Sequence, residues 1–147
     1  MDIIKIRFSA DFDDLGAEIE RGVEDLFRSL GTGFSLAERS WKPPMDMNET
    51  PEQIIIVAEV AGVDKEDLEV EITSKAVRIR ATRHARHCTP DAAYRLAEIQ
   101  YGKFERILFL PAQIDPEIVS ASYSNGFLEI RLAKQPAERI RKVSISD

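Results

Sequence analysis

The chain has 147 residues, 44% of them hydrophobic and 31% charged, a composition that favours one globular domain with flanking arms over a wholly disordered chain. Its formal net charge of -6 argues against general binding to nucleic acids or to anionic membranes. No run approaches the ~20 apolar residues of a membrane-spanning helix, and the opening MDIIKIRFSADFDD lacks the features of a signal peptide, so we expect a cytoplasmic location with no membrane required.

The first predicted element is an amphipathic helix at about residues 13–30, inside an N-terminal arm that we assign to residues 1–40. Asp13 or Asp14 can serve as the N-cap, and Gly31 is a stop signal. Because nothing adjacent in sequence covers its apolar face, the helix needs a partner surface. That face consists of residues at three- and four-residue steps, namely Leu15, Ile19, Val23, Leu26, Phe27 and Leu30.

From about Trp41 to Lys134 the pattern changes to short β-strands. QIIIVAEV is a nearly continuous apolar run, which predicts a strand buried on both faces. LEVEI alternates apolar residues with glutamates and predicts a half-exposed strand. In AVRIRA, Arg78 and Arg80 are expected on the solvent face, so the basic cluster around them is interpreted as a solvated surface.

The second half of this region predicts a further strand and a hairpin. KFERILFLP is an apolar run that ends at Pro111, which cannot donate to a sheet. VSASY and FLEIRL flank Asn125-Gly126, a strong hairpin signal because both central residues of that turn need positive φ. Short strands at this spacing predict an all-β, immunoglobulin-like antiparallel β-sandwich over residues 41–134.

Two segments do not fit into such a sandwich. YRLAEI is strand-like, but it lies inside a long loop between Arg83 and Gly102, and loops of that length are usually functional or disordered. The extension at residues 135–147 ends in KVSISD, in which Val143 and Ile145 have strand spacing. Residues so far from a core usually fray. The tail is therefore either disordered or an apolar plug for another site.

Four motifs follow one another along the chain, namely WKPPMDMNET, VAGVDKEDLEVEI, YGKFERILFLP and ASYSNGFLEIRL. In this order they resemble the small heat-shock protein family, the chaperones built on an α-crystallin domain. WKPPMDMNET resembles the start of that domain, and VAGVDKEDLEVEI is similar to its Gly-(apolar)-x-Lys-Glu-Asp segment. YGKFERILFLP matches its Gly-x-Phe-x-Arg…Leu-Pro strand. ASYSNGFLEIRL matches its Ala-x-x-x-Asn-Gly-(apolar)-Leu signature, here Asn125, Gly126 and Leu128. The resemblance is to the bacterial, archaeal and plant type of member.

The resemblance gives the two unplaced segments a role in assembly. It implies that Val143-Ser144-Ile145 anchors oligomers by docking in a groove of a neighbouring domain, although the family more often has Ile at the first position. It also implies that the loop strand crosses to a partner and completes a dimer, and that Arg106 forms an ion pair within the fold or at the dimer interface. The implied residues are Leu68, Val70, Ile72, Val119, Ala121 and Tyr123 for the groove, and Tyr94, Arg95, Leu96, Ala97, Glu98 and Ile99 for the crossing strand.

The function that the resemblance implies is an ATP-independent holdase that binds partly unfolded proteins and works as a dimer-based oligomer. No phosphate loop, dinucleotide fingerprint or catalytic motif is present, so no cofactor and no enzymatic activity are expected. A non-chaperone adaptor that binds one defined partner is the alternative. The apolar residues expected to bind clients are Phe8, Phe12, Leu15, Ile19, Leu26, Phe27, Leu30 and Phe34.

The segment HARHC is a candidate metal site, because it brings His84, His87 and Cys88 together and Asp91 follows it. Structural zinc sites normally draw ligands from two separated segments, and the chain has no second Cys or His pair. We therefore predict no metal there, and interpret the segment as an exposed loop. As the only cysteine, Cys88 excludes an internal disulfide and suits a reducing compartment, although it could link two chains under oxidation.

Overall fold

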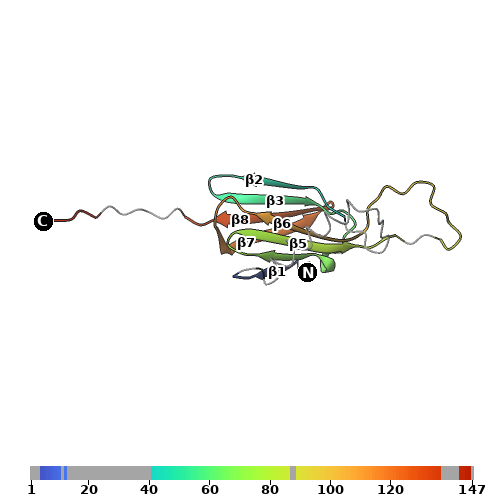
Figure 1. Cartoon of the computed structure of the whole chain (residues 1–147), viewed down its shortest axis with the longest axis horizontal. Helices are drawn as coiled ribbons and strands as arrows, with labels where there is room; N and C mark the ends of the chain where they lie inside the picture. The colour runs from blue at the N-terminus through green and yellow to red at the C-terminus, as the bar shows by residue number, and fades with distance from the viewer. Residues whose placement is uncertain (1–3, 11, 13–40, 87–88, 137–142, 147) are drawn as a thin grey trace, which may run out of the picture.

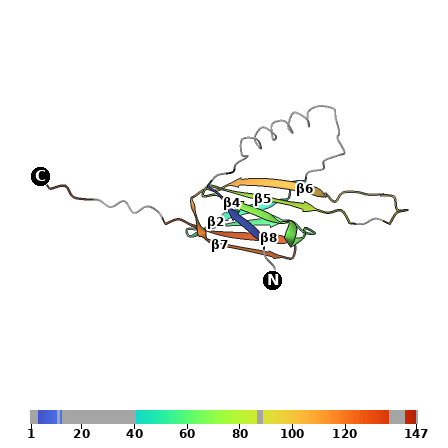
Figure 2. The same cartoon turned by 90° about the horizontal axis from the view of Figure 1, so that it is seen from below.

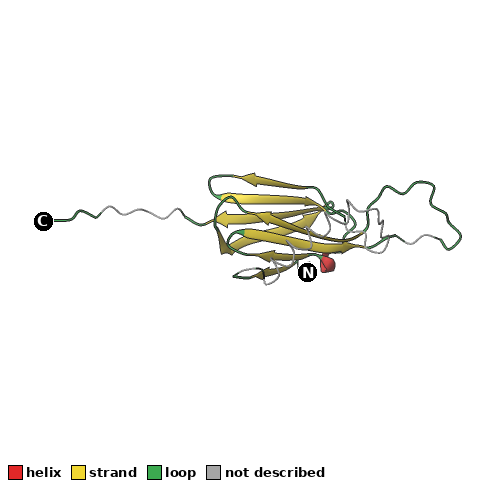
Figure 3. Ribbon diagram, in the orientation of Figure 1, coloured by secondary structure: helices red, strands yellow, loops and turns green. Residues whose placement is uncertain are grey.

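The computed structural model of the chain describes residues 4–10, 12, 41–86, 89–136 and 143–146. Within these ranges β-strands dominate, and η1 is the only helical element (Figures 1 and 3). The elements in chain order are β1 (Lys5–Phe8), β2 (Met45–Glu49), β3 (Gln53–Glu59), the 3₁₀ turn η1 (Lys65–Asp67), β4 (Glu69–Ile72), β5 (Ala76–Arg83), β6 (Gly102–Phe109), β7 (Ile114–Ser124) and β8 (Phe127–Lys134). The helix predicted at about residues 13–30 lies outside the described residues.

The strands form two four-stranded sheets that pack face to face. The first sheet has the order β1-β4-β5-β6 and the second the order β2-β3-β8-β7. Every pairing is antiparallel except that of β1 with β4, which is parallel. This architecture confirms the predicted all-β sandwich. It also contains two strands that the sequence did not predict, β1 and β2.

The core lies between the two sheets and is built from alternate residues of each strand, as the two-residue period of a strand requires. In β3 these are Ile54, Ile56 and Ala58, all fully buried. Ile55 and Val57 on its other face are only partly buried, so the prediction that this strand is buried on both faces is wrong. An antiparallel sandwich covers one face of each sheet, and a continuous apolar run does not change that.

Arg78 of β5 corrects a second prediction, because its side chain is buried rather than on a solvent face. It is 3% exposed, and its Nε donates to Oε2 of Glu71 at 3.0 Å. The guanidinium carbon lies 4.8 Å from the ring centre of Phe12. Glu71 is buried as well, although the pattern of LEVEI predicts it in solvent. The chain segment that begins with β1 covers this outer face of the first sheet.

The hairpin predicted at Asn125-Gly126 is confirmed, and it joins β7 to β8. The two residues have φ of 53° and 82°, the positive values that the tight turn needs. A Cβ on Gly126 would also come within 2.7 Å of the Cβ of Ala61. Both backbone conformation and space therefore require glycine here. The hairpin sets the register of β7, the strand that forms one wall of the site described next.

Candidate functional site: the edge site between β4 and β7

The strands β4 and β7, which belong to different sheets, run alongside one another. The backbone N–H of Ile114, at the start of β7, donates to the carbonyl of Ser74 at 3.4 Å. Near the end of β7, the Tyr123 hydroxyl lies 2.8 Å from the carbonyl oxygen of Val63 and can donate to it. Residues 63 and 74 flank β4 on either side. The segments that flank β4 are therefore joined to the two ends of β7, which places β4 and β7 at the same edge of the sandwich.

We call this region the edge site and define it by the backbone edge of β4 together with the inward side chains of β7. The structure brings together there the six residues predicted for the groove. Leu68, which directly precedes β4, and the two residues of β4 are fully buried, whereas those of β7 are half-buried and pack against the same core. Burial raises the pKa of Tyr123. The six residues are Leu68, Val70, Ile72, Val119, Ala121 and Tyr123.

β1 occupies the edge site, where the sequence led us to expect the tail. It pairs with β4 in parallel, in a register that places Ile6 beside Val70 and Phe8 beside Ile72. Ile4 and Ile6 are partly buried and pack against the core cluster. Figure 2 shows β1 in blue on the side of the sandwich that carries β4 and β7. Residues 5–8 of the predicted N-terminal arm thus form part of the sandwich.

Polar contacts on the outer face hold β1 in place, and they converge on Glu71. Arg7 Nη2 lies 3.0 Å from Glu71 Oε2, and Ser9 Oγ donates to Glu71 Oε1 at 2.8 Å. The backbone N–H of Ser9 donates to the carbonyl of Ile72 at 3.0 Å, which extends the pairing beyond β1. We call the contacts of Arg7 and Ser9 the latch.

The electrostatics of the latch depend on the buried Arg78. Burial by itself raises the pKa of Glu71, but hydrogen bonds from Arg78, Ser9 and Arg7 outweigh it and lower the pKa from 4.5 to about 2. Glu71 is therefore ionised at neutral pH and links two arginines. Since Arg7 is largely exposed, its own ion pair is worth little, and the strong partner of Glu71 is Arg78.

The C-terminal residues lie away from the sandwich. Val143 is 77% exposed and Ile145 is 93% exposed. Residues 143–146 have no regular secondary structure and lie beyond the end of the domain in Figure 1. In this single chain the predicted anchor therefore contacts no groove.

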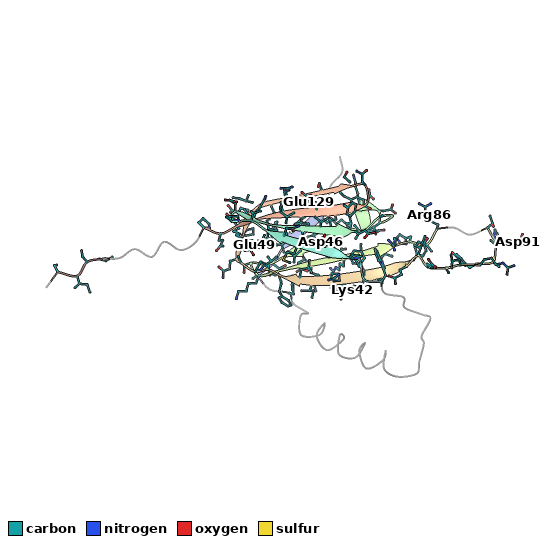
Figure 4. The ribbon with its side chains drawn as sticks, turned by 90° about the horizontal axis from the view of Figure 1, so that it is seen from above. Lys42, Asp46, Glu49, Arg86, Asp91 and Glu129 are labelled. Carbon is teal, nitrogen blue, oxygen red and sulfur yellow. The ribbon has the colours of Figure 1, made fainter. Side chains whose placement is uncertain are left out.

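The loop that contains YRLAEI projects from the opposite end of the sandwich. Figure 4 shows Arg86 and Asp91 on this loop, beyond the ends of the strands. No strand forms at residues 94–99, where Leu96 and Ile99 are exposed. At its base, Nε of Arg83 donates to the carbonyl of Gln100 at 2.8 Å. The loop is thus fixed at its root, and its apolar side chains face solvent.

Arg106 has a role inside the fold. Its Nη1 donates to the carbonyl of Pro43 at 2.8 Å, which ties β6 to the segment that leads into β2. Trp41 joins the same two parts of the chain, because its indole N–H donates to the carbonyl of Gly102, the first residue of β6, at 2.9 Å. The predicted ion pair of Arg106 is thus replaced, within the described residues, by a backbone hydrogen bond. A role at a dimer interface stays a prediction.

Two further sets of predicted residues fall partly outside the described ranges. His84 Nε2 lies 2.9 Å from Oδ2 of Asp67, while His87 and Cys88 are not described. The described residues contain no group of three or more side chains that could hold a metal ion.

Of the residues expected to bind clients, Phe8 is half-exposed and Phe12 is buried against Arg78. The others lie outside the described part of the chain, namely Leu15, Ile19, Leu26, Phe27, Leu30 and Phe34.

The model of the Hsp20/alpha crystallin family matches residues 46–146, which is more than half of the chain. The chain belongs to this family. It is a small heat-shock protein, as the four sequence motifs indicate. Membership supports a chaperone role rather than an enzymatic one. Within the described residues, no helix has the length and apolar character needed to cross a membrane.

Similar proteins come from several kingdoms. Small heat shock protein C2 of Rickettsia felis is 26% identical over 83% of this chain and 80% of its own length. The 22.0 kDa heat shock protein of Arabidopsis thaliana is 30% identical over 84% of this chain and 60% of its own length. Among solved structures, heat shock protein 16.0 from Schizosaccharomyces pombe has a TM-score of 0.61 and 27% identity, over 72% of this chain and 99% of that one. A small heat-shock protein from Xylella fastidiosa has a TM-score of 0.61 and 29% identity, over 73% and 98%.

Sequence reasoning missed the occupant of the edge site in this small heat-shock protein. The stretch that forms β1 is only four residues long, and its apolar residues are interrupted by Lys5 and Arg7. One signal was present: Ile4-Lys5-Ile6 repeats the apolar-x-apolar spacing of Val143-Ser144-Ile145. A comparison of the two ends of the chain would have found it.

Proposed function

We propose that this small heat-shock protein is an ATP-independent holdase that binds partly unfolded proteins and prevents their aggregation. The observation that carries the proposal is the match of residues 46–146 to the Hsp20/alpha crystallin family, because membership supports a chaperone role. The structure adds that Leu96, Ile99, Val143 and Ile145 are exposed on non-strand segments at the two ends of the sandwich. These exposed apolar side chains support self-assembly, because contacts between copies would bury them.

Binding itself supplies the free energy for such a holdase. A partly unfolded client exposes apolar surface, and each large side chain that becomes buried is worth about 1.5–3 kcal/mol. Several shallow contacts of this kind give adhesion without a defined pocket, which suits clients of unrelated sequence. The expected client surface is the apolar face of the N-terminal arm, from Phe8 to Phe34, with assembly keeping it covered until heat loosens the oligomer.

The proposal is tested by following light scattering of two unrelated clients as they aggregate, one on heating and one on reduction. The purified protein should suppress both without ATP. A requirement for ATP, or no suppression of either client at an equimolar ratio, contradicts the proposal. An adaptor with one defined partner, the alternative, would protect neither client.

The dimer is proposed to form by exchange of the projecting loop. β2 is the outermost strand of the second sheet and pairs with β3 along one edge. Figure 4 shows Asp46 and Glu49 along this outer strand. The segment Tyr94–Ile99 of a partner could add to the other edge of β2 and bury Leu96 and Ile99. Backbone pairing would provide affinity, and the apolar side chains would fix the register.

Removing the segment tests the exchange. Replacement of Thr89–Ile99 by a short Gly-Ser linker should give monomers in multi-angle light scattering, because the added strand is lost. Glu98→Gln, which leaves the loop and its apolar residues in place, is the matched control and should remain dimeric. An intact dimer in the linker variant would mean that pairing uses another edge.

Larger assemblies are proposed to form when the tail Val143-Ser144-Ile145 docks on a neighbouring copy. One tail buries two medium-sized side chains, so a single contact is weak. Several tails in one assembly act at high effective concentration through their tethers and hold it together. The protein is expected to need no cofactor, metal, nucleic acid or membrane, and to act in the cytoplasm.

A further inference from the structure

The two ends of the chain carry the same short pattern. Ile4-Lys5-Ile6 and Val143-Ser144-Ile145 each place two β-branched apolar side chains two residues apart. In an extended backbone such residues point to the same side. Ile4 and Ile6 pack against the core at the edge site, whereas Val143 and Ile145 are exposed. The two segments thus carry a similar pair of β-branched side chains, and only the pair of β1 packs at the edge site.

The backbone of β4 can accept only one of them. The register of β1 runs from Lys5 beside Glu69 to Phe8 beside Ile72, which covers all of β4. The other edge of β4 pairs with β5 over the same residues. Both edges of β4 are therefore in use in the single chain. A tail that docks on β4 has to replace β1.

The latch gives β1 an advantage that the tail does not share. We take the tail to dock parallel to β4, as β1 does, and in that direction Arg7 of β1 corresponds to Ser146 of the tail. Arg7 and Ser9 both contact Glu71, which β4 presents on its outer face. An uncharged Ser146 cannot pair with this carboxylate as a cation does. The latch thus favours β1 over the tail.

We infer that β1 is a built-in occupant of the edge site, and that the tail of a second copy of this chain binds there only when β1 has left. The inference rests on the tail docking proposed above. An occupied site lowers the apparent affinity for the tail by the fraction of molecules in which β1 is detached. Assembly through tails and release of the N-terminal arm then become one event.

Release of β1 also uncovers apolar surface. Phe8 belongs to β1, and Phe12 follows it and lies against Arg78. When β1 detaches, both residues leave the sandwich together with the arm that they lead into. In an assembled copy, Phe8 and Phe12 would then belong to the arm that the oligomer keeps covered, and they would become available to clients when heat loosens the assembly.

The test measures how tightly a free tail binds when the latch is weakened. The probe is a fluorescent peptide of residues 140–147, IRKVSISD, followed by anisotropy. Every protein sample is the full chain with Val143→Ala and Ile145→Ala, so that its own tails do not compete. The latch variant adds Arg7→Ala and Ser9→Ala. A matched control adds Arg131→Ala and Ser120→Ala, which are neighbours on the exposed face of the second sheet.

The latch variant should bind the peptide at least about threefold more tightly than its background, because a larger fraction of molecules has an open edge site. The control should bind with the background affinity. Equal affinity in latch variant and background overturns the competition while leaving tail docking in place. If the peptide binds none of the samples, both the competition and the docking are wrong.

A second measurement needs no change in the latch and decides the matter if the latch variant does not fold. Saturating peptide is added to the background protein, and amide hydrogen exchange is compared with and without it. Exchange of the amides of residues 5–9 should speed up at least about threefold as β1 is displaced, while those of β4 stay protected by the incoming strand. Unchanged exchange at residues 5–9 in the presence of bound peptide overturns the inference.

Discussion

The N-terminal strand and the C-terminal tail have nearly the same apolar pattern and opposite surroundings. Ile4 and Ile6 are packed against the core, while Val143 and Ile145 stand in solvent. The side chains themselves do not explain the difference, because two isoleucines and a valine–isoleucine pair bury similar apolar area. The polar neighbours differ. Arg7 and Ser9 contact Glu71, and a tail aligned in the same direction as β1 has Ser146 in the place of Arg7.

This contrast separates two contributions to the affinity of a short strand for a sheet edge, one from apolar side chains and one from polar contacts. We propose that apolar side chains make both segments able to fill the edge site, and that polar contacts on the opposite face decide which one fills it first. Glu71 is central because it serves the latch and the buried Arg78 together. The following predictions alter the two segments or the walls of their shared site.

The largest effect is expected from Glu71→Ala. It removes the carboxylate that pairs with Arg78, whose side chain is only 3% exposed, and it also removes the latch. Loss of one partner of a buried ion pair usually costs about 3–5 kcal/mol, and the remaining contact with Glu105 at 3.6 Å favours the lower figure. Urea denaturation should show this loss.

Glu69→Ala is the matched control for that experiment. Glu69 occupies the same strand and pairs with Arg80 at 2.7 Å, but both side chains are substantially exposed. Exposed pairs contribute about 0–1 kcal/mol. Equal destabilisation by the two substitutions would show that burial of Arg78 does not govern the stability of this face.

The pH dependence of stability should also point to Glu71. Its folded pKa of about 2 lies below the ordinary value of 4.5, so its contribution is fully present above about pH 4.5 and is lost as the pH falls toward 2. The loss amounts to roughly 3 kcal/mol at most. Glu71→Gln should flatten this part of the profile in thermal melts at pH 2–5. The same steep fall in the variant would assign the acid sensitivity to other carboxyls.

Gly126→Val tests the hairpin that sets the register of β7, the second wall of the edge site. Valine cannot easily adopt a φ of 82°, and its Cβ would approach Ala61 too closely. The expected loss is at least about 1–3 kcal/mol. Differential scanning calorimetry measures it, with Ser124→Ala, an exposed neighbour of the turn, as the control that should melt like the wild type. An unchanged melting temperature in Gly126→Val would mean that the turn can rearrange.

Substitution of both Val143 and Ile145 by Ala should have the smallest effect on the fold and act on assembly alone. Burial of the two side chains together is worth on the order of 3–5 kcal/mol before the cost of ordering the tail, so each contact is weak and reversible. Large assemblies should break into dimers or small species in native mass spectrometry, with circular dichroism unchanged. Ser144→Ala should assemble normally, since the middle residue faces away. Wild-type assemblies in the double variant would show that the arm alone builds the oligomer.

The sequence by itself was sufficient for the sandwich, the hairpin and the family. Alternation of apolar residues gives the inward face of each strand, and Asn125-Gly126 is a local signal that needs no tertiary context. Through the resemblance to the family it also named the residues of both walls of the edge site, and docking of the tail between those walls stays a prediction. These features depend on residues close together in sequence, which is why a linear pattern contains them.

Only the tertiary structure decided what fills the edge site and which charges are buried. The pairing of β1 with β4 joins residues more than sixty positions apart, and nothing in Ile4-Lys5-Ile6 alone distinguishes it from the tail. The same segment brings Phe12 against Arg78 and places Arg7 and Ser9 on Glu71, and both of these charged residues are buried on a face that their own strands would otherwise present to solvent. A strand's period determines which residues share a face; whether water or another segment covers that face depends on the long-range packing of the chain.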